Sequence, residues 1–127
     1  MGSDSEVTLA LAAVAREKEL RLTVRGRRSG QPRTVTIWFV ADGDAIAVGS
    51  LRDDRNWIRN IRSASEAEAE IGGRRFVGRV RATAADEHAR IRSAMARKYL
   101  PFRIASWLGM GQRFTFRIED LRLAATV

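Results

Sequence analysis

Apolar and polar residues alternate along much of the chain, and this period of two predicts β-strands. The predicted strands are 20–25, 33–41, 45–50, 66–71, 74–83 and 112–118. Glycine-containing turns at 26–32, 42–44 and 72–73 join pairs of these strands into hairpins. Along 66–71 glutamate alternates with alanine, which indicates one solvated face and a second face of small side chains.

A spacing of three to four between apolar residues predicts helices in other segments. We expect a helix at 5–17, which Ser5 could cap, and a short helix that Asp54 could cap and that contains Trp57, Ile58 and Ile61. Two more helices are expected at 86–99, which Pro101 ends, and at 102–108. The resulting order is helix, three strands, helix, two strands, helix, strand. Hairpins joined by short helices predict an α+β, mainly β domain in which an antiparallel sheet curls into a small barrel. The 127 residues fit one such domain, 1–127.

The composition excludes several classes of site. The chain has no cysteine, so it has no disulfide, no thiolate metal site and no cysteine nucleophile. Its only histidine, His88, lies in a polar run and is expected to be solvated, so no metal site is predicted. No apolar stretch approaches the length of a membrane span, and no basic leader precedes one, which predicts a cytoplasmic protein.

Arginine dominates the charge of the chain. The formal net charge is +8, and 21 arginines stand against 2 lysines. The guanidinium group is a planar fork that binds phosphate and carboxylate well. An anionic partner is therefore expected, and nucleic acid, a phosphorylated cofactor or an acidic surface all satisfy the charge.

The turn at 26–33, Gly-Arg-Arg-Ser-Gly-Gln-Pro-Arg, is the first candidate site. Its glycines permit a positive φ, so that successive backbone N–H groups can converge on an anion. Arg28 and Arg33 flank the turn, and Ser29 adds a hydroxyl donor. Pro32 fixes the entry into the following strand. A solvated hairpin with basic residues explains the same residues equally well.

Two further segments are candidates for a pocket. Trp57 and Asn60 are three residues apart and share a helical face, which suits a polar ring system, although a core tryptophan is the simpler interpretation. The aromatic run 99–111 could line a pocket, pack in the core or form a homodimer interface.

Taken together, these segments resemble the deazaflavin-dependent nitroreductase family of split β-barrel oxidoreductases, which is common in actinobacteria. The resemblance extends from about Leu20 to Tyr99. It depends on four blocks in order: 22–33, Trp-Phe-Val with Asp-Gly at 38–43, Val-Gly-Ser at 48–50 and Asn-Trp-Ile-Arg-Asn-Ile at 56–61. The implied fold is a split β-barrel of the FMN-binding, pyridoxamine-phosphate-oxidase-like type.

The resemblance implies the deazaflavin coenzyme F-420, whose tail carries a phosphate and a polyglutamate chain. By matching positions, the cofactor-binding residues would be Arg28, Ser29, Gln31, Pro32 and Arg33 at the phosphate, Val48, Gly49 and Ser50 beside the ring, and Trp57 and Asn60 at the groove. The implied reaction is hydride transfer from the reduced cofactor to a small-molecule acceptor such as a quinone, an activated alkene or a nitro compound.

The proton for the reduced product could come from Tyr99, Ser50 or water. The nitroreductases that the chain resembles carry several tyrosines after the second long helix, whereas here only Tyr99 remains, with Phe102 and Ala105 at neighbouring positions. This change implies a more apolar pocket.

Other functions stay open at this stage. The same fold could hold FMN, haem or a lipid, or could carry a cofactor without catalysis. FMN phosphate would suit the same arginines, but only a polyglutamate tail needs a basic track leading away from the turn. Nucleic-acid binding is not expected, because the arginines are spread through the chain and no known motif for it occurs.

Overall fold

The computed structural model describes residues 2–25, 27–50, 56–99 and 114–124. The elements in chain order are α1 (Gly2–Val14), β1 (Glu19–Arg25), β2 (Pro32–Asp42), β3 (Ala45–Ser50), α2 (Asn56–Ser63), β4 (Glu66–Ile71), β5 (Arg74–Ala82), α3 (Ala85–Lys98) and β6 (Phe114–Leu123). This is the order that the pattern predicts.

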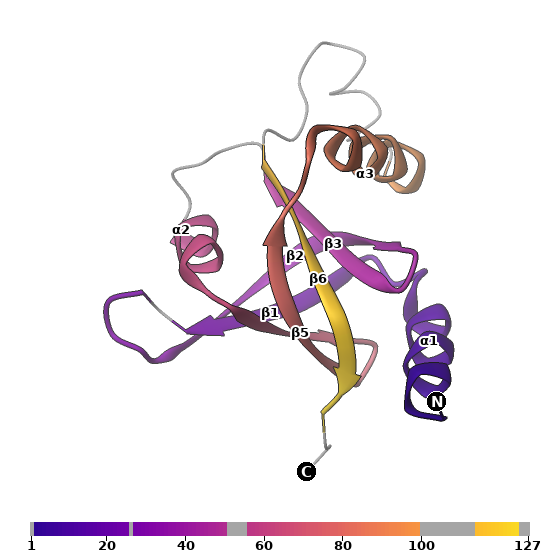
Figure 1. Cartoon of the computed structure of the whole chain (residues 1–127), viewed down its shortest axis with the longest axis horizontal. Coiled ribbons are helices and arrows are strands. Elements are labelled where there is room, and N and C mark those ends of the chain that lie inside the picture. Colours follow the sequence, from indigo (N-terminus) through magenta and orange to yellow (C-terminus); the bar gives the residue numbers. More distant parts are fainter. Residues whose placement is uncertain (1, 26, 51–55, 100–113, 125–127) are drawn as a thin grey trace.

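The six strands close into an antiparallel barrel in the order β1-β2-β3-β6-β5-β4 (Figure 1). Pairing of β1 with β4 completes the ring. Alternate residues point inward, as predicted: Leu20, Leu22 and Val24 of β1 are buried. The alanines of β4 are buried and its glutamates lie on the other face. The expected mainly β, antiparallel barrel is confirmed.

The hairpin of β1 and β2 extends beyond the barrel. The β1–β4 ladder covers only Arg21 to Thr23, whereas the β1–β2 ladder continues to the pair Arg25 and Pro32. The free end of this hairpin therefore projects to one side of the molecule, and α2 lies near its base (Figure 1). The space between α2 and the hairpin is where the candidate site forms.

Helix α3 covers the outer face of β2 and β3. Ile91, Met95 and Tyr99 pack on Val40 and Ala47 in an apolar cluster separate from the barrel interior. The Trp38 ring stacks on the Tyr99 ring with 4.5 Å between centroids and 3° between planes. This second cluster fixes the end of α3 against β2.

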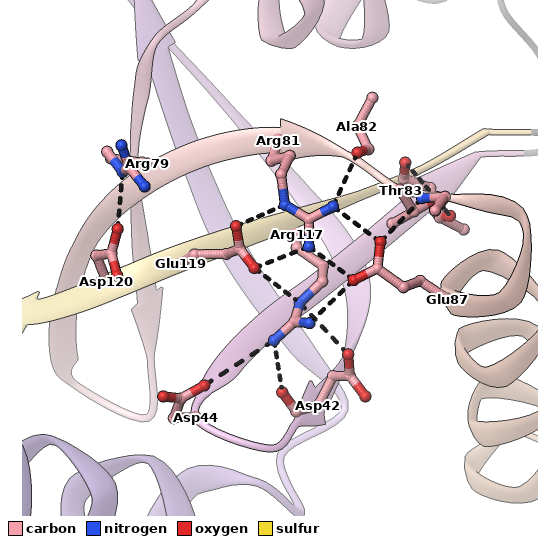
Figure 2. A network of polar contacts seen from close by, with 12 residues as sticks. Asp42, Asp44, Arg79, Arg81, Ala82, Thr83, Glu87, Arg117, Glu119 and Asp120 are labelled. Carbon is pink, nitrogen blue, oxygen red and sulfur yellow. Dashed lines mark hydrogen bonds and ion pairs between the residues drawn. The ribbon is translucent and has the colours of Figure 1, made fainter.

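An ion-pair network holds the start of α3 on the barrel (Figure 2). Arg117 of β6 lies among four carboxylates. It is 3.2 Å from Glu87, 3.4 Å from both Asp42 and Glu119, and 3.9 Å from the exposed Asp44. Arg81 of β5 contacts both glutamates at 2.7 Å. Arg117 and Asp42 are each only 14% exposed, so solvent screens their contact less than that of a surface pair.

The network lowers the pKa of its carboxyl groups. The hydrogen bond from Arg90 holds the pKa of Asp42 below its usual value, against the opposing effect of burial. Hydrogen bonds from Arg81 hold the pKa values of Glu87 and Glu119 low in the same way. These carboxylates therefore stay ionised at neutral pH and keep α3 attached to β5 and β6.

Two elements, α1 and β6, do not end where the sequence predicts. Helix α1 spans Gly2–Val14 instead of 5–17, so Ser5 lies within the helix and does not cap it. Strand β6 continues to Leu123 instead of ending at Ile118, because a register shift near Val77 and Arg79 lets its polar end keep pairing with β5. The helix expected at 102–108, the cap at Asp54 and the run at 100–111 lie outside the described residues.

His88 is less solvated than expected. Its ring is half-buried, and Nδ1 lies 2.8 Å from the Thr115 hydroxyl oxygen, which in turn lies 2.5 Å from that of Thr83. The first turn of α3 packs against β6, and this contact is not visible in the local polar run around His88.

Candidate functional site

A pocket of about 440 Å³ lies between the projecting hairpin and α2. Its described lining comes from the end of β1, the turn, the start of β2 and one face of α2: Val24, Arg27, Arg28, Ser29, Arg33, Thr34, Val35, Trp57 and Asn60. The two sequence blocks that carried the anion-binding and ring-binding predictions thus meet in one hollow.

At Gly30 the turn has the positive φ that its sequence predicts, whereas Gly26 lies outside the described residues. Gly30 has φ of 71°, in the left-handed region that glycine adopts without strain. The Gln31 N–H donates to the Ser29 hydroxyl oxygen at 3.2 Å, and the Arg25 guanidinium donates to the Gly30 carbonyl at 2.9 Å. These bonds shape the turn, and the Ser29 hydroxyl keeps its own proton for a ligand.

The charges of the pocket are unbalanced. Arg27, Arg28 and Arg33 line it together with no Asp or Glu among the described lining residues. Within the described ranges none of the three forms an ion pair. By contrast, Arg75, Arg79, Arg81, Arg117 and Arg122 on the strands are each paired with a carboxylate. The positive charge of this pocket is therefore available to an anion.

Helix α2 supplies the opposite wall. Ile58 and Ile61 are fully buried in the barrel core, which fixes the rotation of the helix. Trp57 and Asn60 consequently face the pocket, as their spacing of three predicts. Trp57 is half-buried and packs at the edge of the core, so both the core interpretation and the pocket interpretation describe part of its surroundings.

Asn60 is joined to the turn. Its Oδ1 accepts a hydrogen bond from the Arg27 backbone N–H at 3.3 Å and one from the Arg27 guanidinium at 3.0 Å. Residues 33 apart in the chain are thus linked, and the projecting turn is tied to α2. Sequence reasoning did not single out Arg27, because its partner is distant in sequence.

Other predicted site residues lie elsewhere. Gln31 is exposed on the turn, and Pro32 lines a second groove on the far side of the hairpin. Val48 is fully buried in the barrel core, and Gly49 pairs with Thr115 in the β3–β6 ladder. Ser50 ends β3 opposite Phe114, and its side chain lies outside the described part. The prediction that 48–50 border a ring stays a prediction.

Tyr99, the residue that follows α3, is buried and does not belong to the described lining of the pocket. Its hydroxyl lies 2.7 Å from the Lys18 carbonyl oxygen and 2.8 Å from that of Phe39, and it accepts from the Phe39 N–H at 3.2 Å. Burial raises the pKa of the phenol. These contacts hold Tyr99 to the backbone of β2.

Sequence reasoning also missed Val24, Thr34 and Val35 as lining residues. Their signal was the strand register, because Val24 pairs with Arg33 and Thr23 pairs with Thr34 where the hairpin leaves the barrel. The described residues contain no group of three or more acidic, histidine or cysteine side chains that could hold a metal ion. No described helix has the length and apolar character needed to cross a membrane.

Residues 5–106 match the family model described as F420H(2)-dependent quinone reductase. No curated protein sequence matches the chain significantly. Several solved structures share its fold. An F420-H2 dependent reductase is 17% identical, with a TM-score of 0.62 over 80% of this chain and 93% of its own.

Two further structures of similar fold bear on the cofactor question. A protein provisionally named a pyridoxamine 5'-phosphate oxidase, from Listeria innocua, is 14% identical, with a TM-score of 0.64 over 95% of this chain and 99% of its own. A FAD-binding protein from Mesorhizobium loti is 16% identical, with a TM-score of 0.59 over 93% of both chains. At these identities the likeness establishes the fold.

Proposed function

The chain belongs to the F420H(2)-dependent quinone reductase family, and from this premise we propose that it transfers a hydride from reduced F420 to a quinone, an activated alkene or a nitro compound. It is thus an oxidoreductase, an F420H2-dependent reductase. The observation that supports the cofactor's position most strongly is the pocket, whose described lining holds three arginines and no carboxylate.

The residues of the pocket fit the anionic part of this cofactor. Arg28 on the turn and Arg33 on β2 offer guanidinium forks, and the Ser29 hydroxyl lies between them in sequence. Trp57 and Val35 give the same hollow an apolar wall. In our proposal the arginines and Ser29 hold the phosphate group, and Trp57 and Asn60 close the groove.

When bound, the deazaflavin supplies the hydride chemistry, and the protein positions it and excludes water. The chain need not provide a nucleophile. A side chain or water has to deliver one proton to the reduced acceptor. Because the Tyr99 hydroxyl is already engaged with two backbone carbonyls, we favour Ser50 or water for this task.

FMN or FAD is the second candidate ligand, because a FAD-binding protein shares the fold and a flavin phosphate suits the same arginines. The discriminating feature is a basic track for a polyglutamate tail. The groove on the far side of the hairpin does not supply one, since Glu66 and Glu68 line it together with Arg25 and Arg27. A polyanionic tail would have to leave along the side of Arg28 and Arg33.

The activity is tested by following the oxidation of reduced F420, from its absorbance, with menadione, a cyclic enone or a nitroaromatic compound as acceptor. We expect enzyme-dependent oxidation with at least one acceptor class. The Arg79→Ala/Arg122→Ala variant changes two exposed, paired arginines and is the control, which should keep full activity. Tight binding of F420 without turnover of any acceptor would instead indicate a cofactor carrier.

A further inference from the structure

Asn60 is a buried polar side chain inside a helix, a position that asparagine does not favour. Only 7% of its surface is exposed. Its amide oxygen lies 3.3 Å from the Arg27 backbone nitrogen and 3.0 Å from the Arg27 guanidinium nitrogen. Both of these Arg27 groups are hydrogen-bond donors only, so the Asn60 atom between them has to be the oxygen. Arg27 therefore determines which way the amide is turned.

This orientation determines what Asn60 presents to the pocket. In a planar amide the nitrogen points away from the groups that bind the oxygen, and Asn60 lines the pocket. The amide nitrogen has no hydrogen-bond partner among the described residues. It is also not completely buried, because the only completely buried side-chain nitrogen or oxygen without a hydrogen-bond partner in the described part of the chain is Arg117 Nε. An NH₂ group only donates, so the ligand atom that it meets has to be an acceptor.

The surrounding charges specify that acceptor further. Arg28 and Arg33 line the same pocket without a carboxylate partner among the described residues, and Ser29 adds a hydroxyl donor. The polar side chains of the described lining, those of Arg27, Arg28, Ser29, Arg33, Thr34 and Asn60, are thus donors or can act as donors. An anionic oxygen satisfies them together, whereas a neutral carbonyl would leave the guanidinium charges without a counter-charge.

We propose that Arg27 is a positioning residue which locks Asn60 as a donor, and that the pocket thereby selects a ligand whose phosphate oxygen lies at the Asn60 amide nitrogen. This inference rests on the proposed function and identifies the Asn60 amide nitrogen as a hydrogen-bond donor in that site. It also gives Arg27 a role that differs from that of Arg28, which lines the pocket but forms no hydrogen bond with Asn60 among the described contacts.

The Asn60→Asp variant distinguishes a donor from a structural residue. Aspartate has the same shape and keeps an oxygen for Arg27, so a purely structural role predicts that it is tolerated better than Asn60→Ala. A donor role predicts the opposite order, because a carboxylate oxygen would then face the ligand anion. We expect F420 affinity, measured by fluorescence titration, to fall about tenfold in Asn60→Ala and about 100-fold in Asn60→Asp.

A double-mutant cycle tests the positioning role. Arg27→Ala removes the guanidinium bond of 3.0 Å to the Asn60 oxygen and keeps the longer backbone bond of 3.3 Å. The variant should cost about tenfold in the wild-type background but about twofold in the Asn60→Ala background, because no amide is then left to orient. Arg28→Ala is the matched control and should cost the same in both backgrounds. Thermal unfolding identifies variants that have lost the fold. If Asn60→Asp does not fold, the double-mutant cycle of Arg27→Ala and Asn60→Ala tests the positioning role without it.

Different results would contradict the inference about Asn60 and the proposed function. If wild-type protein binds F420 while Asn60→Asp binds better than Asn60→Ala, or while Arg27 and Asn60 act additively, the inference is wrong and the proposed function stands. If wild-type protein binds neither F420 nor FMN, the proposed function is wrong and the inference falls with it.

Discussion

Arg27, Arg28 and Arg33 differ from the arginines of β5 and β6 in their surroundings. On the strands, a guanidinium is usually placed beside a carboxylate, as Arg79 is beside Asp120 at 2.7 Å. Exposed pairs of this kind contribute little to stability. Around the pocket the same residue type meets no carboxylate in the described part. The amino-acid composition does not distinguish arginines that form ion pairs from arginines that are available to a ligand. Their positions in the fold do.

Tyr99 can be tested directly as a structural residue or as the proton donor. Its hydroxyl contacts the backbone of Lys18 and Phe39 in a buried position. We predict that Tyr99→Phe lowers the free energy of unfolding by about 1–2 kcal/mol, through the loss of buried hydrogen bonds. Reduced F420 should still be oxidised at close to the wild-type rate. A large loss of rate in a stably folded variant would make Tyr99 the proton donor instead.

Lys98 gives a prediction for alkaline pH. Its ammonium group contacts the carbonyl oxygens of Ala15 and Phe39 at 3.0 Å, and burial lowers its pKa from 10.5 to about 8. Between these pH values the unfolded chain binds the proton and the folded protein has released it. The contribution of Lys98 to the free energy of unfolding should therefore rise from pH 8 to 10.5.

Denaturant unfolding at several pH values, with Lys98→Met as the reference, measures this slope. The wild type should gain stability relative to the variant across the window. A flat or falling difference would show that the carbonyl contacts and the Phe39 ring, 3.7 Å from the ammonium nitrogen, stabilise the charged form enough to cancel the effect of burial.

At the scale of elements, the packing of β5 against β6 depends on the absence of a side chain at Gly78. A Cβ at this position would lie 2.5 Å from the Glu119 carbonyl oxygen and 2.9 Å from side-chain atoms of Ile118 and Leu121. We predict that Gly78→Ala destabilises the protein by about 1–3 kcal/mol, because the strands have to move apart. Thermal unfolding measures the loss.

Gly73→Ala is not a suitable control for this experiment, because Gly73 has a positive φ of 83°. Ala82→Gly at the other end of β5 changes the backbone entropy of an exposed position and leaves the close contact untouched. Equal loss of stability in both variants would contradict the steric explanation.

The elements themselves follow from the sequence, and their contacts do not. The alternation along β1, β4 and β5 predicts both the strands and their buried faces, because a strand places successive side chains on opposite faces. The hairpin turn and the helical face shared by Trp57 and Asn60 are also specified by neighbouring residues in the sequence. The Arg27–Asn60 contact joins residues 33 apart, and no local pattern specifies it.

The same distinction explains the errors. Glu119 and Asp120 resemble the end of a strand, yet β6 continues past them because β5 offers a shifted register and Arg79 and Arg81 offer partners. His88 lies in a polar run and still contacts Thr115 of a distant strand. Both of these errors concern a contact between elements that are far apart in sequence.

At the scale of the whole molecule, the network around Arg117 joins the β2–β3 turn, β5, β6 and α3 (Figure 2). The pKa values of Asp42, Glu87 and Glu119 are lowered in the folded state. The unfolded chain therefore binds protons that the folded protein excludes once the pH falls below about 4.5. The stability from these carboxylates is complete above that pH and is lost progressively below it.

We predict that acid unfolds the wild type through this network. Unfolding measured between pH 7 and 3 should show a steep loss of stability, and Glu87→Gln should be less stable at pH 7 but show a shallower slope. Parallel curves for the two proteins would contradict a contribution of Glu87 to acid sensitivity.

The central claim is that the arginine-lined pocket holds the phosphate-bearing part of F420, and a fluorescence titration tests it most directly. Wild-type protein, Arg28→Ala/Arg33→Ala and the control Arg79→Ala/Arg122→Ala would each be titrated with F420 and, in parallel, with FMN. We expect tight binding of F420 in preference to FMN by wild type and control. We also expect a loss of about 100-fold or more in the pocket variant with an unchanged unfolding temperature. Equal F420 affinity in all three proteins, or a preference for FMN, would contradict the central claim.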